Sequence, residues 1–386
     1  MDRADVVIIG GGVTGLSSGY WLAKAGKDVV IVEKGNIGME ASGRAGGLIS
    51  AGRDNASVIP TIVESLKIWP TLEEELGYPT EFVYKGRLKA AMTEEDMDRV
   101  YEMLEDYHNN GLRAEVVDTK EMQDLVPGLS EKALGGLFTL DGGHANPQRT
   151  VQAYAWGFQD RGGRLYQNTA VTGITVKNDR IFSVETTAGS IRTDFVVSAA
   201  GPQTGLLGEM VGVHIPIAPC RAESIVTVPL EPRFEISLVG NGLYGRQTKK
   251  GNLHFGGGPL EWIDVEATTQ PPKPSTHMVR NIARRLAELL PGVEDIRVLR
   301  GWAGIVESTP DSEPIIDRLD YPEGFIVAVQ SGHGFAPSPA TGVAVRDLVL
   351  QGEASFDISE FRFDRFNGIP RSWRQAMGWQ PGAYNT

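Results

Sequence analysis

The first 34 residues contain, in immediate succession, a buried strand, a glycine-rich turn, a helix and a second strand that ends in an acid. Residues 5–9 (DVVII) are β-branched, continuous and bounded by glycine, which predicts a short parallel strand. Residues 16–26 (LSSGYWLAKAG) predict a helix that stops at a glycine, and residues 28–34 (DVVIVEK) predict the second strand. This order restricts the N-terminal part of the chain to an α/β unit built on a parallel sheet.

The turn in this unit has the spacing Gly10-x-Gly12-x-x-Gly15. Gly10 lets the chain turn sharply, Gly12 lets the backbone approach a pyrophosphate, and Gly15 lets the helix pack closely on the strand. The helix N-terminus supplies N–H groups and partial positive charge for phosphates. Glu33, 18 residues after Gly15, is placed to accept hydrogen bonds from ribose hydroxyls, and its charge disfavours the 2′-phosphate of NADP. The pattern predicts a dinucleotide site, with FAD and NAD both open at this point. A glycine-rich turn in another α/β protein is the alternative.

The composition narrows the class of protein further. A length of 386 residues suggests two domains. Asp and Glu outnumber Lys and Arg by 49 to 37, which argues against general nucleic-acid binding. The single cysteine, Cys220, forms no internal disulfide and excludes cysteine-based zinc or iron–sulfur sites, so we expect no metal. No apolar run is long enough to span a membrane and no signal-peptide pattern precedes the first strand, so we expect a cytoplasmic protein.

Further blocks follow the dinucleotide motif along the chain. They are residues 40–50 (EASGRAGGLIS), 140–163 (LDGGHANPQRTVQAYAWGFQDRGG), 193–204 (TDFVVSAAGPQT), 301–317 (GWAGIVESTPDSEPIID) and 325–352 (FIVAVQSGHGFAPSPATGVAVRDLVLQG). Together with the motif, they resemble the D-amino acid oxidase (DAO) superfamily of FAD enzymes. That superfamily includes glycine oxidase, sarcosine oxidase, and the β subunits of heteromeric sarcosine oxidases and proline-type dehydrogenases.

The resemblance implies an α/β fold with a discontinuous, Rossmann-like FAD-binding domain and an α+β substrate domain on a mainly antiparallel sheet. The FAD-binding domain would comprise residues 1–50, 141–212 and 301–365, and the substrate domain residues 51–140 and 213–300. Residues 366–386 form a C-terminal tail, whose aromatic residues suggest docking on this or another subunit. These aromatics are Phe366, Trp373 and Trp379. A helix over residues 93–111, with Thr93 as its N-cap, is predicted from the residues alone.

The resemblance also implies which residues hold FAD. A segment rich in serine, glycine and arginine wraps the flavin and pyrophosphate, and the helix starting near residue 338 directs N–H groups at the flavin N1/C2 region. The implied cofactor residues are Gly10, Gly12, Val13, Thr14, Gly15, Glu33, Lys34, Ser42, Gly43, Arg44, Ala45, Gly46, Gly47, Leu48, Val171, Ala200, Gly201, Gly304, Gly332, His333, Gly334 and Phe335. We expect the FAD to be non-covalent, because no histidine precedes His108 and Cys220 does not match the cysteine linkage of monomeric sarcosine oxidases.

Four residues are catalytic candidates. Tyr244 matches a tyrosine that in parts of the superfamily points at the substrate carboxylate, and a packed strand tyrosine is the alternative. Arg246 shares a strand face with Tyr244 and is a possible carboxylate clamp, with a solvated surface position as the alternative. His254 stands where monomeric sarcosine oxidases have a lysine that promotes oxygen reactivity. It is expected to tune the flavin or move a proton, or else to be structural. His333 is expected near the flavin through its backbone.

One departure from the superfamily concerns substrate binding. Amino-acid oxidases often carry an arginine two residues after the WAG sequence to hold the α-carboxylate, and here that position is Val306. Another residue must hold the carboxylate, or the substrate lacks one there. The neighbouring Glu307 is a candidate contact for an amine, although a role away from the substrate is the simpler interpretation.

The leading hypothesis is an FAD-dependent amine oxidoreductase. It would oxidise the C–N bond of a small amino acid or secondary amine, of the sarcosine, glycine, proline or D-amino acid type, by hydride transfer to flavin N5, leaving an imine. The alternatives are an FAD dehydrogenase of a C–O bond, acting on a 2-hydroxy acid or glycerol 3-phosphate, and a tRNA-modifying flavoprotein or flavin subunit of a larger complex. The expected partner is the amine or amino acid itself. A homo-oligomer, or partner subunits that accept electrons, is left open.

Overall fold

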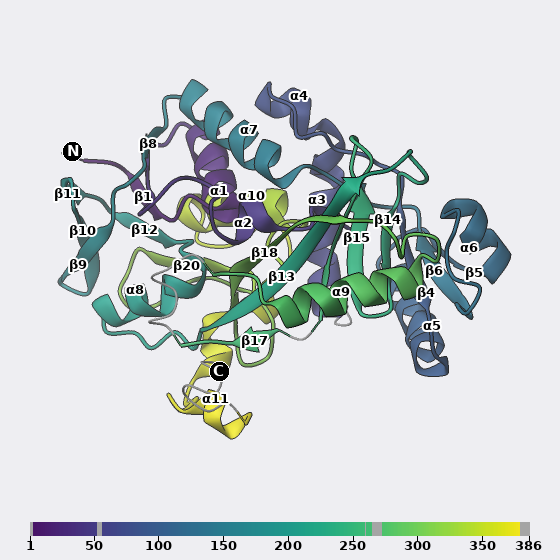
Figure 1. Cartoon of the computed structure of the whole chain (residues 1–386). Coiled ribbons are helices and arrows are strands. Elements are labelled where there is room, and N and C mark those ends of the chain that lie inside the picture. The colour runs from purple at the N-terminus through teal and green to yellow at the C-terminus, as the bar shows by residue number, and fades with distance from the viewer. Residues whose placement is uncertain (1–2, 52–55, 259, 265–271, 379–386) are drawn as a thin grey trace.

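The computed structural model describes residues 3–51, 56–258, 260–264 and 272–378 (Figure 1). Within these residues, a six-stranded sheet has the order β19–β20–β12–β1–β2–β8. All its strands are parallel except β19, which runs antiparallel to β20. Its strands are β1 (Val6–Ile9), β2 (Val29–Val32), β8 (Arg164–Tyr166), β12 (Phe195–Ser198), β19 (Ile315–Arg318) and β20 (Phe325–Val329). The central strands are fully buried, which is why they are continuous apolar runs. Helices cover one face, and the three strands of residues 171–192 with the helix of residues 204–210 pack on the other.

A second sheet of nine strands is antiparallel apart from the pairing of β14 with β4. Its order is β17–β13–β16–β15–β14–β4–β6–β5, and β18 also pairs with β13. Its strands are β4 (Arg87–Ala91), β5 (Ala114–Val117), β6 (Gly135–Thr139), β13 (Ala218–Pro229), β14 (Ser237–Gly240), β15 (Leu243–Gln247), β16 (Asn252–Gly257), β17 (Glu261–Trp262) and β18 (Val298–Ser308). Smaller sheets are formed by β9 (Val171–Lys177), β10 (Arg180–Thr186) and β11 (Gly189–Arg192), and by β3 (Leu48–Ile49) with β7 (Gly143–His144).

Helices pack on both sheets. In Figure 1, α1, α7 and α10 gather around the parallel sheet, while α9 lies along the antiparallel sheet and α5 and α6 lie at its far end. The helices are α1 (Val13–Lys24), α2 (Ala41–Arg44), α3 (Ile59–Ile68), α4 (Leu72–Leu76), α5 (Glu94–Asn109), α6 (Thr119–Leu125), α7 (Pro147–Asp160), α8 (Thr204–Met210), α9 (Thr276–Leu289), α10 (Ser338–Leu350) and α11 (Trp373–Ala376). The mixed α/β class predicted from the sequence is confirmed.

The glycine-rich turn is tight for a steric reason. A Cβ on Gly15 would lie 2.1 Å from the carbonyl oxygen of Gly10, so a larger residue would push α1 away from β1. The close packing of helix on strand predicted for Gly15 is therefore present. The predicted N-cap of α5 is present as well, because the Thr93 hydroxyl accepts a hydrogen bond from the backbone N–H of Asp96.

The predicted domain boundaries stay predictions, but the strands can be placed against them. Every strand of the parallel sheet comes from the segments expected to form the FAD-binding domain. The antiparallel sheet draws on the segments expected for the substrate domain, with β18 as the exception. The boundary at residue 301 cuts through β18, which pairs with β13 from Val298 to Ser308 and so belongs to the antiparallel sheet. The helices α3 and α4, from the substrate segment, pack on α10 and α7.

The C-terminal segment docks on the same chain. Phe366 and Trp373 are buried, and the Trp373 ring meets Trp262 edge-on, with 5.7 Å between centroids. Arg374 donates a hydrogen bond to the backbone oxygen of Ile263. Trp379, the third aromatic residue predicted to dock, lies outside the described residues.

Candidate active site

A cavity of about 510 Å³ lies between the two sheets. One wall is formed where β1, β12 and β20 end, at Gly10, Ala200 and Gln330. The opposite wall is formed by the antiparallel sheet, through residues such as Tyr244 on β15 and Gly304 on β18. Ligands of open parallel sheets bind beyond the carboxyl ends of the strands, so this is where the dinucleotide motif predicts a ligand.

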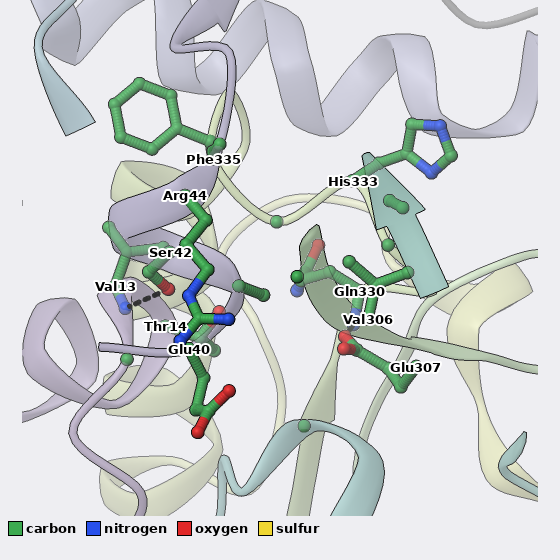
Figure 2. A pocket seen from close by; sticks show the side chains of 18 of the residues that line it. Val13, Thr14, Glu40, Ser42, Arg44, Val306, Glu307, Gln330, His333 and Phe335 are labelled. Carbon is green, nitrogen blue, oxygen red and sulfur yellow. Dashed lines mark hydrogen bonds between the residues drawn. The ribbon is translucent and has the colours of Figure 1, made fainter. Parts of the chain in front are cut away.

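The end of the cavity beside α1 is built from backbone. Gly10 has a φ of +116°, and a Cβ there would lie 2.3 Å from the carbonyl oxygen of Ala199 on the neighbouring strand end. Gly12 is the N-cap of α1 and has no side chain to cover the helix N-terminus. The backbone N–H of Val13 donates to the Ser42 hydroxyl at 3.0 Å (Figure 2). Gly12, Val13 and Thr14 line the cavity, so the N-terminus of α1 lies at this end, where a phosphate is expected.

Glu33 is fixed at the end of β2. Its carboxylate accepts hydrogen bonds from the backbone N–H groups of Gly11 and Gly35, each at 2.8 Å. Glu33 and Lys34 both line the cavity. The carboxylate is thus positioned by the same turn that shapes the α1 end, where a ribose is expected.

The segment from Arg44 to Leu48 is held between the two sheets. Arg44 donates from Nη1 to the Ala303 oxygen at 2.7 Å, and Trp302 Nε1 donates to the Arg44 oxygen at 3.1 Å. Arg246 Nε donates to the Gly46 oxygen at 3.0 Å. The segment therefore forms a fixed inner wall of the cavity, as the resemblance implies for the residues around a flavin.

The loop from β20 to α10 forms another wall. The cavity is lined there by Gln330 and by the stretch from Gly332 to Pro337. His333 and Phe335 lie at its upper edge in Figure 2. The Gln330 side chain is buried, and its Oε1 has no hydrogen-bond partner among the described residues. A buried amide oxygen without a partner is rare, so this oxygen is a candidate acceptor for a ligand bound in the cavity.

Glu307 stands beside this loop. Its Oε1 accepts the backbone N–H of Gln330 at 3.0 Å, and the residue is buried. Burial raises the pKa of this carboxyl, against the hydrogen bonds from the backbone of Gln330 and Gly332. Glu307 lines the cavity, so its side chain can meet a cofactor or substrate, a role that the sequence interpretation set aside.

The catalytic candidates fall into two groups. Tyr244 and His333 line the cavity. Arg246 instead lines a second cavity of about 550 Å³, on the other side of the Gly46 backbone. His254 lines neither cavity and packs against the Trp302 ring, with 4.8 Å between centroids. Tyr244 and Arg246 thus share a strand face, as predicted, but the Gly46 segment separates their side chains.

Burial shifts the pKa of two of these side chains, His254 and Arg246. Burial, together with the charge of Arg246, lowers the pKa of His254 to about 3, so its imidazole is neutral near neutral pH. Burial lowers the pKa of Arg246 to about 10, and the guanidinium remains charged. His254 is therefore a neutral, enclosed histidine, which favours the structural alternative given above.

Most of the expected cofactor residues line the cavity. The exceptions are Gly15, Gly43 and Val171. Gly15 serves the packing of α1, and a Cβ on Gly43 would lie 2.0 Å from the Gly38 oxygen, so Gly43 is needed for the fold around α2. Val171 begins β9 in the three-stranded sheet. The sequence analysis did not identify Arg87 and Thr61, which also line the cavity, because neither belongs to a recognisable motif.

The chain is similar to known proteins by family profile, by sequence and by structure. A sequence profile of the family described as FAD dependent oxidoreductase (DAO) matches residues 5–348. The sarcosine oxidase subunit beta of Rhodobacter capsulatus is 30% identical over 377 residues, covering 94% of this chain and 89% of that protein. The glycine oxidase of Geobacillus kaustophilus is 31% identical over 383 residues, covering 95% and 98%. The crystal structure of L-proline dehydrogenase from P. horikoshii matches with a TM-score of 0.89 at 26% identity, covering 95% and 98%.

Proposed function

Because this chain belongs to the DAO family of FAD-dependent oxidoreductases, we propose that it oxidises the carbon–nitrogen bond of a small amino acid or secondary amine. The observation that carries the proposal is that the cavity of about 510 Å³ joins the glycine-rich turn before α1 to the Tyr244 face of the antiparallel sheet. Relatives matched over nearly their whole length are named for sarcosine, glycine and proline, which are all small amino acids.

The residues of the cavity fit FAD. Gly10 and Gly12 leave room for a pyrophosphate against α1, where a Cβ on Gly10 would fill the space beside Ala199. The Glu33 carboxylate stands where ribose hydroxyls are bound. The unpartnered Gln330 oxygen and the loop after β20 are placed for the flavin. Bound there, FAD supplies the hydride acceptor for the carbon next to the substrate nitrogen.

The protein's own contribution is positioning and exclusion of water. Trp302 lines the cavity and anchors the Arg44 oxygen, so it fixes one edge of the inner wall. Tyr244 projects into the same space, and burial raises the pKa of its phenol, which keeps it protonated and able to donate a hydrogen bond. The N-terminus of α10 lies behind the loop from Gly332 to Phe335, where its partial positive charge stabilises negative charge on the ligand.

The oxidation of a C–O bond is less well supported. That reaction needs a base to take the hydroxyl proton. His254 does not line the cavity and has a pKa of about 3, so it is poorly suited to this role. His333 lines the cavity and is the remaining candidate for that base, with its Nδ1 at 2.8 Å from the backbone oxygen of Ser331.

The proposal leaves two kinds of electron acceptor to be distinguished, oxygen and a partner subunit. A relative named as a subunit beta supports the idea that partner subunits take part.

No helix among the described residues is long and apolar enough to cross a membrane. Those residues contain no group of three or more side chains arranged to hold a metal ion. The cytoplasmic location expected from the sequence stays a prediction.

The test is anaerobic reduction of the purified, FAD-loaded protein. Sarcosine, glycine, proline, D-amino acids and 2-hydroxy acids are added in turn, and bleaching of the oxidised flavin band is followed. Bleaching by an amine that air reverses rapidly indicates an oxidase, and bleaching that persists in air indicates a dehydrogenase with another acceptor. Bleaching by hydroxy acids alone contradicts the proposed C–N chemistry.

A further inference from the structure

We propose that Arg87, on β4, binds the carboxylate of the amino-acid substrate, and this inference rests on the proposed function. The usual position for a carboxylate-binding arginine is occupied by Val306, which lines the cavity but offers no charge. Arg87 lines the same cavity and is only 4% exposed. A buried guanidinium facing a ligand cavity is suited to a carboxylate, which it holds through paired, charge-assisted hydrogen bonds.

The other cations of the cavity lie at the cofactor end. Among the described residues, Lys34 follows Glu33 at the end of β2, where the ribose is expected. Arg44 projects beside Ser42 and Thr14 at the start of α1 (Figure 2), and its Nη1 donates to the Ala303 oxygen. Both are placed for the dinucleotide. Arg87 is the cavity arginine that belongs to the antiparallel sheet.

The sheet register puts Arg87 and Tyr244 on the same face of the antiparallel sheet. Val239 on β14 pairs with Tyr244 on β15, and Ser237, two residues earlier, pairs with Arg87 on β4. Residues two apart on a strand share a face, so Tyr244, Val239 and Arg87 lie on one face of three adjacent strands. All three line the cavity. Because β14 lies between β15 and β4, the two backbones are roughly 10 Å apart, which leaves room for a small amino acid between the phenol and the guanidinium.

The surroundings of Arg87 hold it in place. Its Nη1 donates to the Tyr107 hydroxyl at 3.3 Å, and that hydroxyl donates to the Ala51 oxygen at 2.7 Å. Thr61 lines the same cavity, and its hydroxyl is buried without a hydrogen-bond partner among the described residues.

Part of the cavity lining beside Arg87 and Thr61 is apolar. Val58 and Ile62, beside Thr61 along the chain, line the cavity together with Val239. This lining favours a substrate whose carbon skeleton is compact and apolar next to its carboxylate, such as an N-alkyl or cyclic amino acid. A polar side chain would be desolvated there without partners.

The test uses a pair of ligands that differ in the carboxylate alone. Pyrrole-2-carboxylate and pyrrole-2-carboxamide are titrated into the FAD-loaded enzyme, and the perturbation of the flavin absorption band gives each Kd. We expect wild type to prefer the carboxylate. R87M should weaken carboxylate binding by roughly 10- to 150-fold, the loss expected for a hydrogen bond to a charged group, and leave carboxamide binding unchanged. R99M, which removes an exposed arginine of α5, is the matched control and should change neither.

Several results overturn the assignment. They are the absence of a carboxylate preference in wild type, an unchanged preference in R87M, or loss of the preference in R246M instead. If R87M does not fold or retain FAD, R87K decides the question. Lysine keeps the charge but loses the paired geometry, so carboxylate binding equal to wild type contradicts the proposal. Reduction of wild-type flavin by amino acids is measured in parallel: failure there refutes the proposed function, whereas reduction with an unchanged KM in R87M refutes the Arg87 assignment alone.

Discussion

Substitutions in the glycine-rich turn distinguish an effect on the stability of the fold from an effect on FAD affinity. Gly10 and Gly26 both have positive φ, +116° and +82°, and a Cβ on Gly26 meets nothing within 4 Å. Gly26→Ala therefore measures backbone strain alone, about 1–2 kcal/mol. Gly10→Ala adds a contact of 2.3 Å with the Ala199 oxygen. Forcing atoms into packed space typically costs about 1–3 kcal/mol, so we expect Gly10→Ala to lose roughly 2–5 kcal/mol of unfolding free energy.

Gly12→Ala should behave differently. Gly12 has a φ of −79° and a ψ of 177°, which alanine adopts without strain, and its Cβ would lie 3.1 Å from the Ser42 hydroxyl. That hydroxyl sits on a side chain that can move, so the loss of stability should stay within about 1 kcal/mol. The same methyl group enters the space that a pyrophosphate needs, so we expect FAD affinity to fall at least ~10-fold.

The assays are urea unfolding of the FAD-free proteins and titration of each with FAD, followed by flavin fluorescence. The reasoning is refuted if Gly10→Ala is no less stable than Gly26→Ala, because the Ala199 contact then carries no strain. It is also refuted if Gly12→Ala loses stability while binding FAD like wild type.

Three further predictions concern groups away from this turn. Burial, aided by the charge of Arg246, lowers the pKa of His144 from 6.5 to about 4. The unfolded state therefore takes up a proton first, and stability falls as pH drops from about 6.5 toward 4. Between pH ~7.5 and ~5, His144 should account for about 2 kcal/mol of the unfolding free energy lost, with His254 adding to it, so urea unfolding of His144→Gln should show a loss smaller by about that amount. Trp373→Ala, which empties a buried site, should expose the C-terminal segment to protease, whereas Met377→Ala, at a 55% exposed residue, should not. Burial raises the pKa of the Cys220 thiol to about 12, so iodoacetamide should label it in urea and spare it in the native protein; rapid native labelling contradicts that burial.

The parts of the fold set by local sequence could be predicted. β1, α1 and β2 follow from an apolar run, spaced glycines and a second apolar run, and β20 with α10 follows in the same way. The assignment of β18 to the antiparallel sheet could not be predicted. Its partner β13 lies about eighty residues earlier in the sequence. The residues of β18 are equally compatible with a further strand of the parallel sheet. The pairing depends on tertiary packing, which no local pattern records.

The candidate site shows the same limit at the level of single side chains. The two-residue period of a strand placed Tyr244 and Arg246 on one face, and the structure agrees. A strand face, however, extends past the ligand cavity, and the Gly46 backbone crosses it between the two residues, accepting a hydrogen bond from Arg246. Arg87 comes into the cavity from β4 through the parallel pairing with β14, across about 150 residues of sequence. The alternation of a strand therefore selects a face, while the loop that crosses that face decides which of its side chains meet the substrate.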